Sequence, residues 1–358
     1  MKILYVDYYY HYGNNKNGIN NIGVDGFAKA FKELGHVVYN FHLDKHLDNL
    51  EQMNTALLDY FNVISPDLVF FNLYHKKVNV KTIMKMTEKS TTVNWFGDDP
   101  FIFENFTKLY APYFTICITT DKFSMHKYKE IGQNNVIYSQ WPAFETTHID
   151  LDVKKYNYEV SFVGDKNPPR AWFINELLKR GIKVSTFGTG WESGRVDNDE
   201  MLKIFLNSKI NLNLSNSDTW DLKFLLSPYI SKFFLIAILF RRIIKTMLKL
   251  INKKIKIHQI TFTGKYSSQI KARNFEIPVS GGFQLSHYVP TLEDYFYIGK
   301  ELACFNTIDE AEKQIKYYLR DDTEREKIKI AGYNKAVNEF TYKIVVSRVL
   351  KEITSIKK

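Results

Sequence analysis

The sequence predicts an α/β protein with two doubly wound parallel sheets in tandem. Its 358 residues suit two domains, and 45% hydrophobic residues are enough for two cores and exclude a disordered chain. Short apolar runs alternate with amphipathic helical patterns through the first half, and the alternation restarts after a polar stretch at 150–157. Apolar strands that alternate with helices form parallel sheets covered on both faces.

The first domain, 1–150, begins with a strand that runs into a glycine-containing loop. We expect strands at 2–7, 37–41, 68–72, 92–96, 114–118 and 136–139. We expect helices between them at 19–34, 47–64 and 122–131. Gly35 ends the first helix, and Pro66 breaks the chain before the third strand.

The second domain, 151–340, repeats the pattern. Strands are expected at 158–163, 183–187, 209–214, 283–285 and 302–305, with helices at 171–179, 198–207 and 269–278. Thr307 with Glu310, and Thr323 with Glu326, predict capping boxes that open two later helices. Residues 341–358 are expected to form a helix that packs back on the first domain. Because ligands of doubly wound sheets bind beyond the carboxyl ends of the strands, we expect the site between the domains.

The positive charge is confined to one segment. The net charge is +10, yet 222–275 holds 12 basic residues and no acidic residue. A nucleic-acid-binding protein would spread its cations more widely, so this distribution argues against one. Within 230–256, apolar residues recur every three or four positions, with a stripe of Arg241, Lys245, Lys249 and Lys253 on another face. We therefore expect a basic amphipathic helical insert at about 222–265.

Two interpretations of this insert remain open. It could lie on an anionic membrane surface, or its apolar face could pack on the protein itself or on a second subunit. Its most apolar run, 233–240, is much shorter than the ~20 residues that span a bilayer. The N-terminus lacks the pattern of a signal peptide, and Cys117 and Cys304 are the only cysteines, which fits a reducing compartment. We expect a cytoplasmic protein, with peripheral contact at the inner face of the membrane.

The most informative stretch is 269–305. It places Lys271, Arg273 and Glu276 close together before the pair Gly281 and Gly282. Cations and exposed backbone N–H groups suit a diphosphate, and a carboxylate beside them suits a ribose diol. The alternative is a surface helix with solvated charges and a glycine turn.

The C-terminal half resembles the donor domain of GT-B glycosyltransferases, specifically the CgeB-like (spore-maturation-type), group 1 family. The matching pieces are YEVSFVGDKNPPR (158–170), FGTGW (187–191), SKINLNLS (208–215), IKARNFEIPVSGGFQLS (270–286), LEDYFYIGKELACF (292–305) and AGYNKAVNEFTYKIVVSRV (331–349). The resemblance implies two Rossmann-like domains that face a cleft. It also implies metal-independent transfer of a hexosyl group, with a nucleotide-diphosphate sugar as co-substrate and no cofactor.

The resemblance implies a set of donor-binding residues. Glu276 matches the glutamate that bonds the donor ribose, and Gly281 and Gly282 match the tight turn beside the diphosphate. The other matching positions are Lys271 and Arg273 near the phosphates, Gly164 and Arg170 in the first loop, and Gly188, Gly190 and Trp191 in the second. Trp191 suits either base stacking or core packing. Ser268 stands where many retaining relatives have a second glutamate, so the stereochemical outcome stays open.

Catalytic candidates come from the first domain. Asp98 and Asp99 follow a strand and precede Pro100, so either could act as general base on an acceptor hydroxyl. Helix capping by these aspartates is the alternative. His11, in the first loop, is a second candidate base. We expect no bound metal, and no Walker phosphate loop or nucleophile elbow is present.

We therefore expect a glycosyltransferase that acts in the synthesis of a cell-surface polysaccharide or glycoconjugate. Its partners would be a nucleotide sugar, a glycan or lipid-linked acceptor and, through 230–256, an anionic membrane, but no nucleic acid. Two alternatives remain: a sugar-nucleotide epimerase on the same double fold, and a non-catalytic structural or coat protein that retains the fold.

Overall fold

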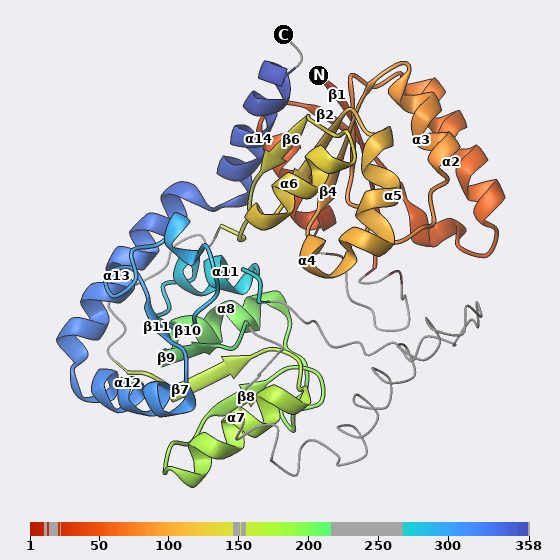
Figure 1. Ribbon diagram of the computed structural model, residues 1–358. Coiled ribbons are helices and arrows are strands. Elements are labelled where there is room, and N and C mark those ends of the chain that lie inside the picture. The colour runs from red at the N-terminus through yellow and green to blue at the C-terminus, as the bar shows by residue number, and fades with distance from the viewer. Residues whose placement is uncertain are drawn as a thin grey trace, which may run out of the picture.

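The chain forms two parallel sheets, each with its own helices (Figure 1). The computed structural model describes residues 1–10, 13, 21, 23–145, 151, 155–215 and 268–356. The first sheet has the order β2-β1-β3-β4-β5-β6. Its strands are β1 (Lys2–Asp7), β2 (Val37–His42), β3 (Leu68–Phe71), β4 (Thr91–Phe96), β5 (Ile116–Thr119) and β6 (Val136–Tyr138). The two-domain α/β architecture predicted from the sequence is confirmed.

Helices cover both faces of this sheet and bury two apolar clusters. One cluster gathers around Met53, Leu57 and Phe71, and the other around Phe27 and Trp95. The elements are η3 (Val24–Ala28), α1 (Lys29–Glu33), η4 (Leu43–His46), α2 (Leu50–Ile64), α3 (Val80–Thr87), α4 (Asp99–Ile102), η5 (Phe103–Thr107), α5 (Lys108–Tyr110), η6 (Ala111–Tyr113), η7 (Lys122–Ser124) and α6 (Met125–Glu130).

Two differences from the sequence prediction have local causes. The described part of the helix expected at 19–34 is a π turn, η3, that continues into α1. Helix α3 lies between β3 and β4, where the alternating pattern predicts a helix without giving its bounds, and it begins at an asparagine cap: Asn79 Oδ1 accepts a hydrogen bond from the Lys81 amide.

The second sheet has the order β11-β10-β9-β7-β8. Its strands are β7 (Tyr158–Val163), β8 (Ser185–Phe187), β9 (Ser208–Asn213), β10 (Gln284–His287) and β11 (Ala303–Phe305). Its helical elements are α7 (Pro168–Lys179), α8 (Asn198–Leu206), α11 (Arg273–Val279), η8 (Leu292–Asp294), α12 (Ile308–Arg320) and α13 (Asp322–Glu339). One core cluster lies under α7 and α12, and another surrounds Phe275 of α11.

One of the two predicted capping boxes is wrong. Thr307 caps α12, because its hydroxyl accepts from the Glu310 amide. Helix α13 instead opens at Asp322, and its cap is Asp321, whose carboxylate accepts from the Glu324 amide. Thr323 therefore lies inside the first turn, since the stronger acceptor two residues earlier starts the helix.

The chain returns to the first domain at its C-terminal end. Helix α14 (Tyr342–Ile356) packs on α1 and η3, beside the first sheet (Figure 1). The Ala143 amide donates to the Phe340 carbonyl at 2.8 Å, and the Tyr342 amide donates to the Ala143 carbonyl at 3.1 Å. The end of α13 and the start of α14 are thus fixed to the segment that leaves the first domain.

Two predictions lie outside the described residues, namely the basic insert at about 222–265 and His11. Within the part of the chain that the structure describes, no helix is long and apolar enough to cross a membrane.

Candidate active site

The site lies where the carboxyl end of β4 meets the segment that leads into α11. The Gln269 side-chain amide donates to the Gly97 carbonyl at 2.6 Å and lies 3.3 Å from Asp98 Oδ1. Lys271 Nζ lies 2.5 Å from the same Asp98 oxygen. These contacts join residues about 170 positions apart in the sequence. They bring the predicted base Asp98 and the predicted phosphate ligand Lys271 into one place.

Local structure explains why Asp98 reaches this junction. Gly97 follows β4, and a Cβ there would lie 1.8 Å from the Trp141 ring. Glycine therefore allows the indole to pack against the backbone at the strand's end. Asp98 then occupies the cap position of α4, but its side chain makes no capping hydrogen bond. Its side chain, 39% exposed, points to Lys271 instead.

Asp99 has a different environment from its neighbour. It is fully buried, and its carboxylate accepts hydrogen bonds from Thr107 at 2.7 Å, Thr119 at 2.5 Å and Tyr128 at 2.7 Å. Burial raises the pKa of Asp99 to about 6, and the three hydroxyl donors partly oppose that rise. All three donors belong to the first domain, so the contacts of Asp99 lie inside that domain rather than at the junction.

On the donor side, Glu276 and Arg273 form an ion pair on the first two turns of α11. Arg273 Nη1 lies 2.7 Å from Glu276 Oε2, and the guanidinium lies over the Phe205 ring. The Glu276 side chain is only 8% exposed. A carboxylate fixed in this way can accept hydrogen bonds from the two hydroxyl groups of a diol. The guanidinium beside it can neutralise a phosphate.

Arg170 approaches from the other side of the same edge. Its guanidinium donates to the Leu214 carbonyl, just beyond β9, and to the Asp165 carbonyl at 2.8 Å. Burial lowers the pKa of Arg170; Asp165 opposes this, and the positive charge of Arg273 lowers it further. Two guanidinium groups thus lie close enough to repel each other at the carboxyl edge of the second sheet. An anion placed there would relieve that repulsion.

The loops after β7 and β8 fold against each other. Gly188 has φ +128°, and a Cβ there would lie 2.3 Å from the Gly164 carbonyl oxygen. Trp191 Nε1 donates to that oxygen at 2.8 Å, and the Lys166 ammonium lies over the indole ring. Trp191 also packs against the core cluster, which favours a packing role. Gly190 has φ +86° and lies against the Lys166 side chain.

The turn after α11 needs both of its glycines. Gly281 has φ +71°, which disfavours other residues. A Cβ on Gly282 would lie 2.7 Å from Asn211 Nδ2 and 2.9 Å from the Phe205 carbonyl oxygen. The close approach of this turn to β9 and α8 therefore depends on the absence of a side chain.

Two contributors to the site were not predicted as site residues, Gln269 and Asn274. Asn274 is fully buried, and its Oδ1 accepts from the Lys271 amide and the Ser215 hydroxyl. It therefore holds the backbone from which Lys271 projects. The available signal was their position, because Gln269 and Asn274 flank Lys271 and Arg273 in the most informative stretch of the sequence.

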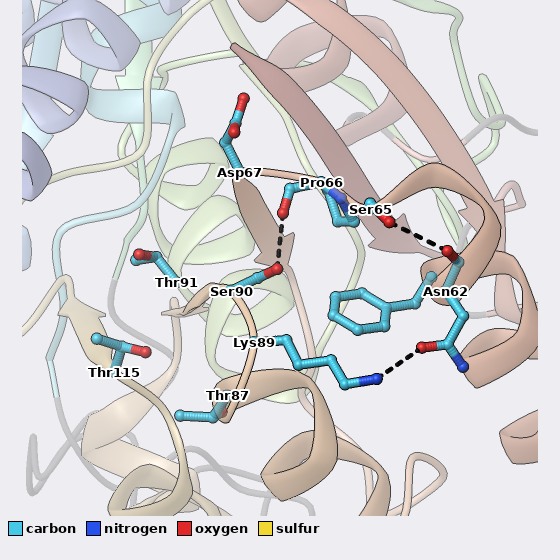
Figure 2. A pocket seen from close by; sticks show the side chains of 10 residues that line it. Asn62, Ser65, Pro66, Asp67, Thr87, Lys89, Ser90, Thr91 and Thr115 are labelled. Carbon is cyan, nitrogen blue, oxygen red and sulfur yellow. Dashed lines mark hydrogen bonds between the residues drawn. The ribbon is translucent and has the colours of Figure 1, made fainter.

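A polar hollow of about 740 Å³ lies elsewhere, at the amino ends of β3, β4 and β5 (Figure 2). Its polar groups bond to each other: Ser90 donates to the Pro66 carbonyl, and Lys89 donates to Asn62. Because ligands of doubly wound sheets bind at the carboxyl ends of the strands, we assign it no part in the site. Among the described residues, no three His, Cys, Asp or Glu side chains lie together as metal ligands would.

Part of the chain matches a known family model, and solved structures share its fold. Residues 247–351 match a family model described as glycosyl transferase-like. A glycosyltransferase from Rickettsia africae has a TM-score of 0.64 at 9% identity, covering 100% of this chain and 98% of that one. No curated protein matches the sequence.

Two further solved structures share the whole architecture. HepE of Anabaena in complex with UDP-glucose has a TM-score of 0.57 at 10% identity, covering 99% of this chain and 100% of that one. Sucrose-phosphate synthase from Thermosynechococcus elongatus has a TM-score of 0.59 at 8% identity, covering 100% and 99%. At these identities the likeness concerns the fold. The chain has the GT-B fold, with two Rossmann-like domains.

Proposed function

We propose that this protein is a glycosyltransferase that moves a sugar from a nucleotide-diphosphate sugar to an acceptor hydroxyl. The observation that carries the proposal is the group of Arg170, Arg273 and Glu276 at the carboxyl edge of the second sheet, with Lys271 of the same segment paired to Asp98 of the first domain. The matched family model and the neighbour that was solved with UDP-glucose support a nucleotide sugar as the donor.

In this proposal the transfer balances as follows. The acceptor oxygen forms a bond to the anomeric carbon, and the bond from that carbon to the diphosphate oxygen breaks. The electron pair of that bond leaves with the diphosphate, and the acceptor's proton passes to Asp98. Arg273, Arg170 and Lys271 neutralise the charge that develops on the diphosphate, without a bound metal. Glu276 binds the ribose.

Asp98 is preferred over Asp99 as the base because only Asp98 lies at the junction and is partly exposed. His11 stays a candidate base from the sequence. The donor-domain motifs further support a CgeB-like hexosyltransferase. The apolar and basic pattern of 230–256 supports an acceptor held at an anionic membrane surface, such as a lipid-linked glycan or a surface polysaccharide.

One observation favours a second function, that of a non-catalytic protein retaining the fold. Glu276 is nearly buried and already paired with Arg273, so its contacts are satisfied without a ligand. A buried ion pair of this kind also occurs where it has only a structural role.

A thermal-shift panel of UDP-, GDP-, ADP-, CMP- and dTDP-linked sugars separates the two functions. A ligand at 100 times its dissociation constant stabilises the protein by about 2.7 kcal/mol. We expect one nucleotide class to stabilise the wild type but not Glu276→Ala. Glu200→Ala, at an exposed position on α8, is the control that should keep the shift. If no nucleotide stabilises the wild type, the non-catalytic function is favoured.

A further inference from the structure

The ion pair between Asp98 and Lys271, here called the junction ion pair, joins residues with opposite tasks in the proposed function. We propose that it keeps the base in a less reactive state until the donor binds. The donor diphosphate then pairs with Lys271, and Asp98, no longer paired with that lysine, becomes the stronger base that accepts the acceptor's proton. This inference rests on the proposed function and adds an order of events to it, with the donor before the acceptor.

Lys271 and Gln269 both contact the same carboxylate oxygen of Asp98. Lys271 Nζ lies 2.5 Å from Asp98 Oδ1, and Gln269 Nε2 lies 3.3 Å from the same atom. An oxygen that already accepts from an ammonium group and an amide has its lone pairs engaged. Oδ1 is therefore engaged while the junction ion pair persists, and the nearby ammonium charge makes the whole carboxylate a weaker base.

The charges around Lys271 favour the diphosphate as its partner. Lys271 stands two residues before Arg273, and Arg273 is close enough to Arg170 for their charges to interact. A diphosphate that reached Lys271 would also be attracted by these guanidinium groups, whereas Asp98 brings a single charge. The junction ion pair is partly exposed, with Lys271 at 26% and Asp98 at 39%. Exposed pairs of this kind are weak, so a stronger anion can replace Asp98.

Gln269 gives an independent sign that this junction changes when ligand binds. The Gly97 carbonyl only accepts hydrogen bonds, so the amide nitrogen of Gln269 must face it and Oε1 must face away. That Oε1 is buried, with no hydrogen-bond partner among the described residues. A buried acceptor without a donor disfavours the arrangement that holds it. A substrate hydroxyl that reached Oε1 would remove this cost as the junction opens.

A double-mutant cycle on donor affinity tests the inference. We would titrate UDP-glucose, GDP-mannose, ADP-glucose and dTDP-glucose into the wild type, Asp98→Asn, Lys271→Met and the double variant. Whichever sugar nucleotide binds the wild type should bind Asp98→Asn more tightly, by up to about fivefold, because Lys271 is no longer paired with the Asp98 carboxylate. In the Lys271→Met background, Asp98→Asn should leave the dissociation constant unchanged.

The cycle separates release of Lys271 from simple repulsion. If Asp98 only repelled the diphosphate, its removal would tighten binding equally in both backgrounds, and the inference would be overturned. Unchanged affinity in Asp98→Asn would overturn it as well. Asp98→Ser serves as a second variant should the asparagine fold poorly.

The protein contains a matched control for these variants. Lys122 and Asp294 form a second ion pair between the same two domains, at 2.7 Å, and neither belongs to the proposed site. Asp294→Asn should therefore leave the donor affinity unchanged. If no sugar nucleotide binds any of these proteins, the proposed function falls and the inference with it. If a sugar nucleotide binds the wild type but Asp98→Asn has the same effect with and without Lys271, the inference is overturned and the proposed function stands.

Discussion

The neighbours Asp98 and Asp99 show how position at the end of one strand sets the chemistry of a side chain. Asp98 points across the domain junction to Lys271, whereas Asp99 turns inward to three hydroxyl donors. Asp7, at the end of β1, resembles Asp99: it is fully buried and accepts from Tyr5, Asn21, Asn72 and the Tyr8 amide. These two carboxylates are buried inside the first domain, whereas Asp98 is partly exposed at the domain junction.

Asp7 makes the stability of the first domain depend on pH. Burial raises the pKa of Asp7 to about 7 from the ordinary 3.8, although its hydrogen bonds oppose the rise. Between these pH values the folded state binds more protons than the unfolded state, so the free energy of unfolding falls as pH rises. The fall contributed by Asp7 can reach about 1.4 kcal/mol per pH unit.

We therefore expect Asp7→Asn, which cannot titrate, to destabilise the protein more at pH 5 than at pH 8. Urea unfolding of both proteins at the two pH values measures the difference. Asp59→Asn, at an exposed position on α2, is the control. If Asp7→Asn lowered the free energy of unfolding equally at the two pH values, the raised pKa of Asp7 would be contradicted.

At the scale of elements, the loops after β7 and β8 depend on a glycine contact. Gly188 combines φ +128° with the 2.3 Å approach that a Cβ would make to the Gly164 oxygen. Gly181, after α7, has φ +81° but no atom within 4 Å of a Cβ. An alanine at Gly181 therefore measures the cost of backbone strain alone, whereas an alanine at Gly188 adds the cost of a steric clash.

We expect Gly181→Ala to lower the free energy of unfolding by about 1 kcal/mol, from strain alone. Gly188→Ala should cost at least about 2 kcal/mol and also weaken nucleotide binding, because the loop beside Arg170 must shift. Denaturant unfolding and the nucleotide thermal shift measure the two effects. Equal costs for both variants would show that the Gly164 contact does not constrain the loop.

At the scale of the whole molecule, α14 joins the C-terminal end of the chain to the first domain. Tyr342 packs edge-on against Phe27 at 5.2 Å, contacts Phe144, and lies against Gly26, which has no side chain to displace it. The apolar face of α14 completes the cluster around Phe27 and Trp95. The two domains are therefore linked by more than the segment that connects their sheets.

Tyr342→Ala should lower the free energy of unfolding by about 3–5 kcal/mol, because it removes a buried aromatic ring. Ile356→Ala, near the end of the same helix at 38% exposure, should change it by less than about 0.5 kcal/mol. Denaturant unfolding checks both. A small effect at Tyr342 would mean that α14 contributes little to the first domain.

The basic segment provides a prediction about the environment of the protein. Neutralising three lysines near an anionic surface removes about 1 kcal/mol each. Binding to phosphatidylserine vesicles should therefore fall by roughly two orders of magnitude when Lys245, Lys249 and Lys253 become Gln. The exposed control set, also changed to Gln, comprises Lys300, Lys313 and Lys327. Equal vesicle binding by both variants would argue for packing on protein instead.

The sequence by itself determined the two sheets, because apolar strand runs and helical periodicity are local properties of the chain. Most strands were placed to within one or two residues, and the donor motif at 270–286 pointed to Glu276 and its neighbours. The bounds of short helices such as α3 and α5 were not predicted, since one or two turns give few residues from which to place the ends. The capping box predicted at Thr323 was wrong because Asp321, two residues earlier, is a stronger cap and has Glu324 three residues after it.

Only the tertiary structure showed which side chains from distant segments meet at the site. The sequence could not separate Asp98 from Asp99, because the hydroxyl donors of Asp99 and the cation beside Asp98 come from distant segments. It could not identify Gln269 as a junction residue either, since its partner Gly97 is contributed by the other domain. The local sequence determines which helices and strands form. The packing of the two domains determines which side chains meet at the end of β4 and before α11, and so what chemistry they can perform together.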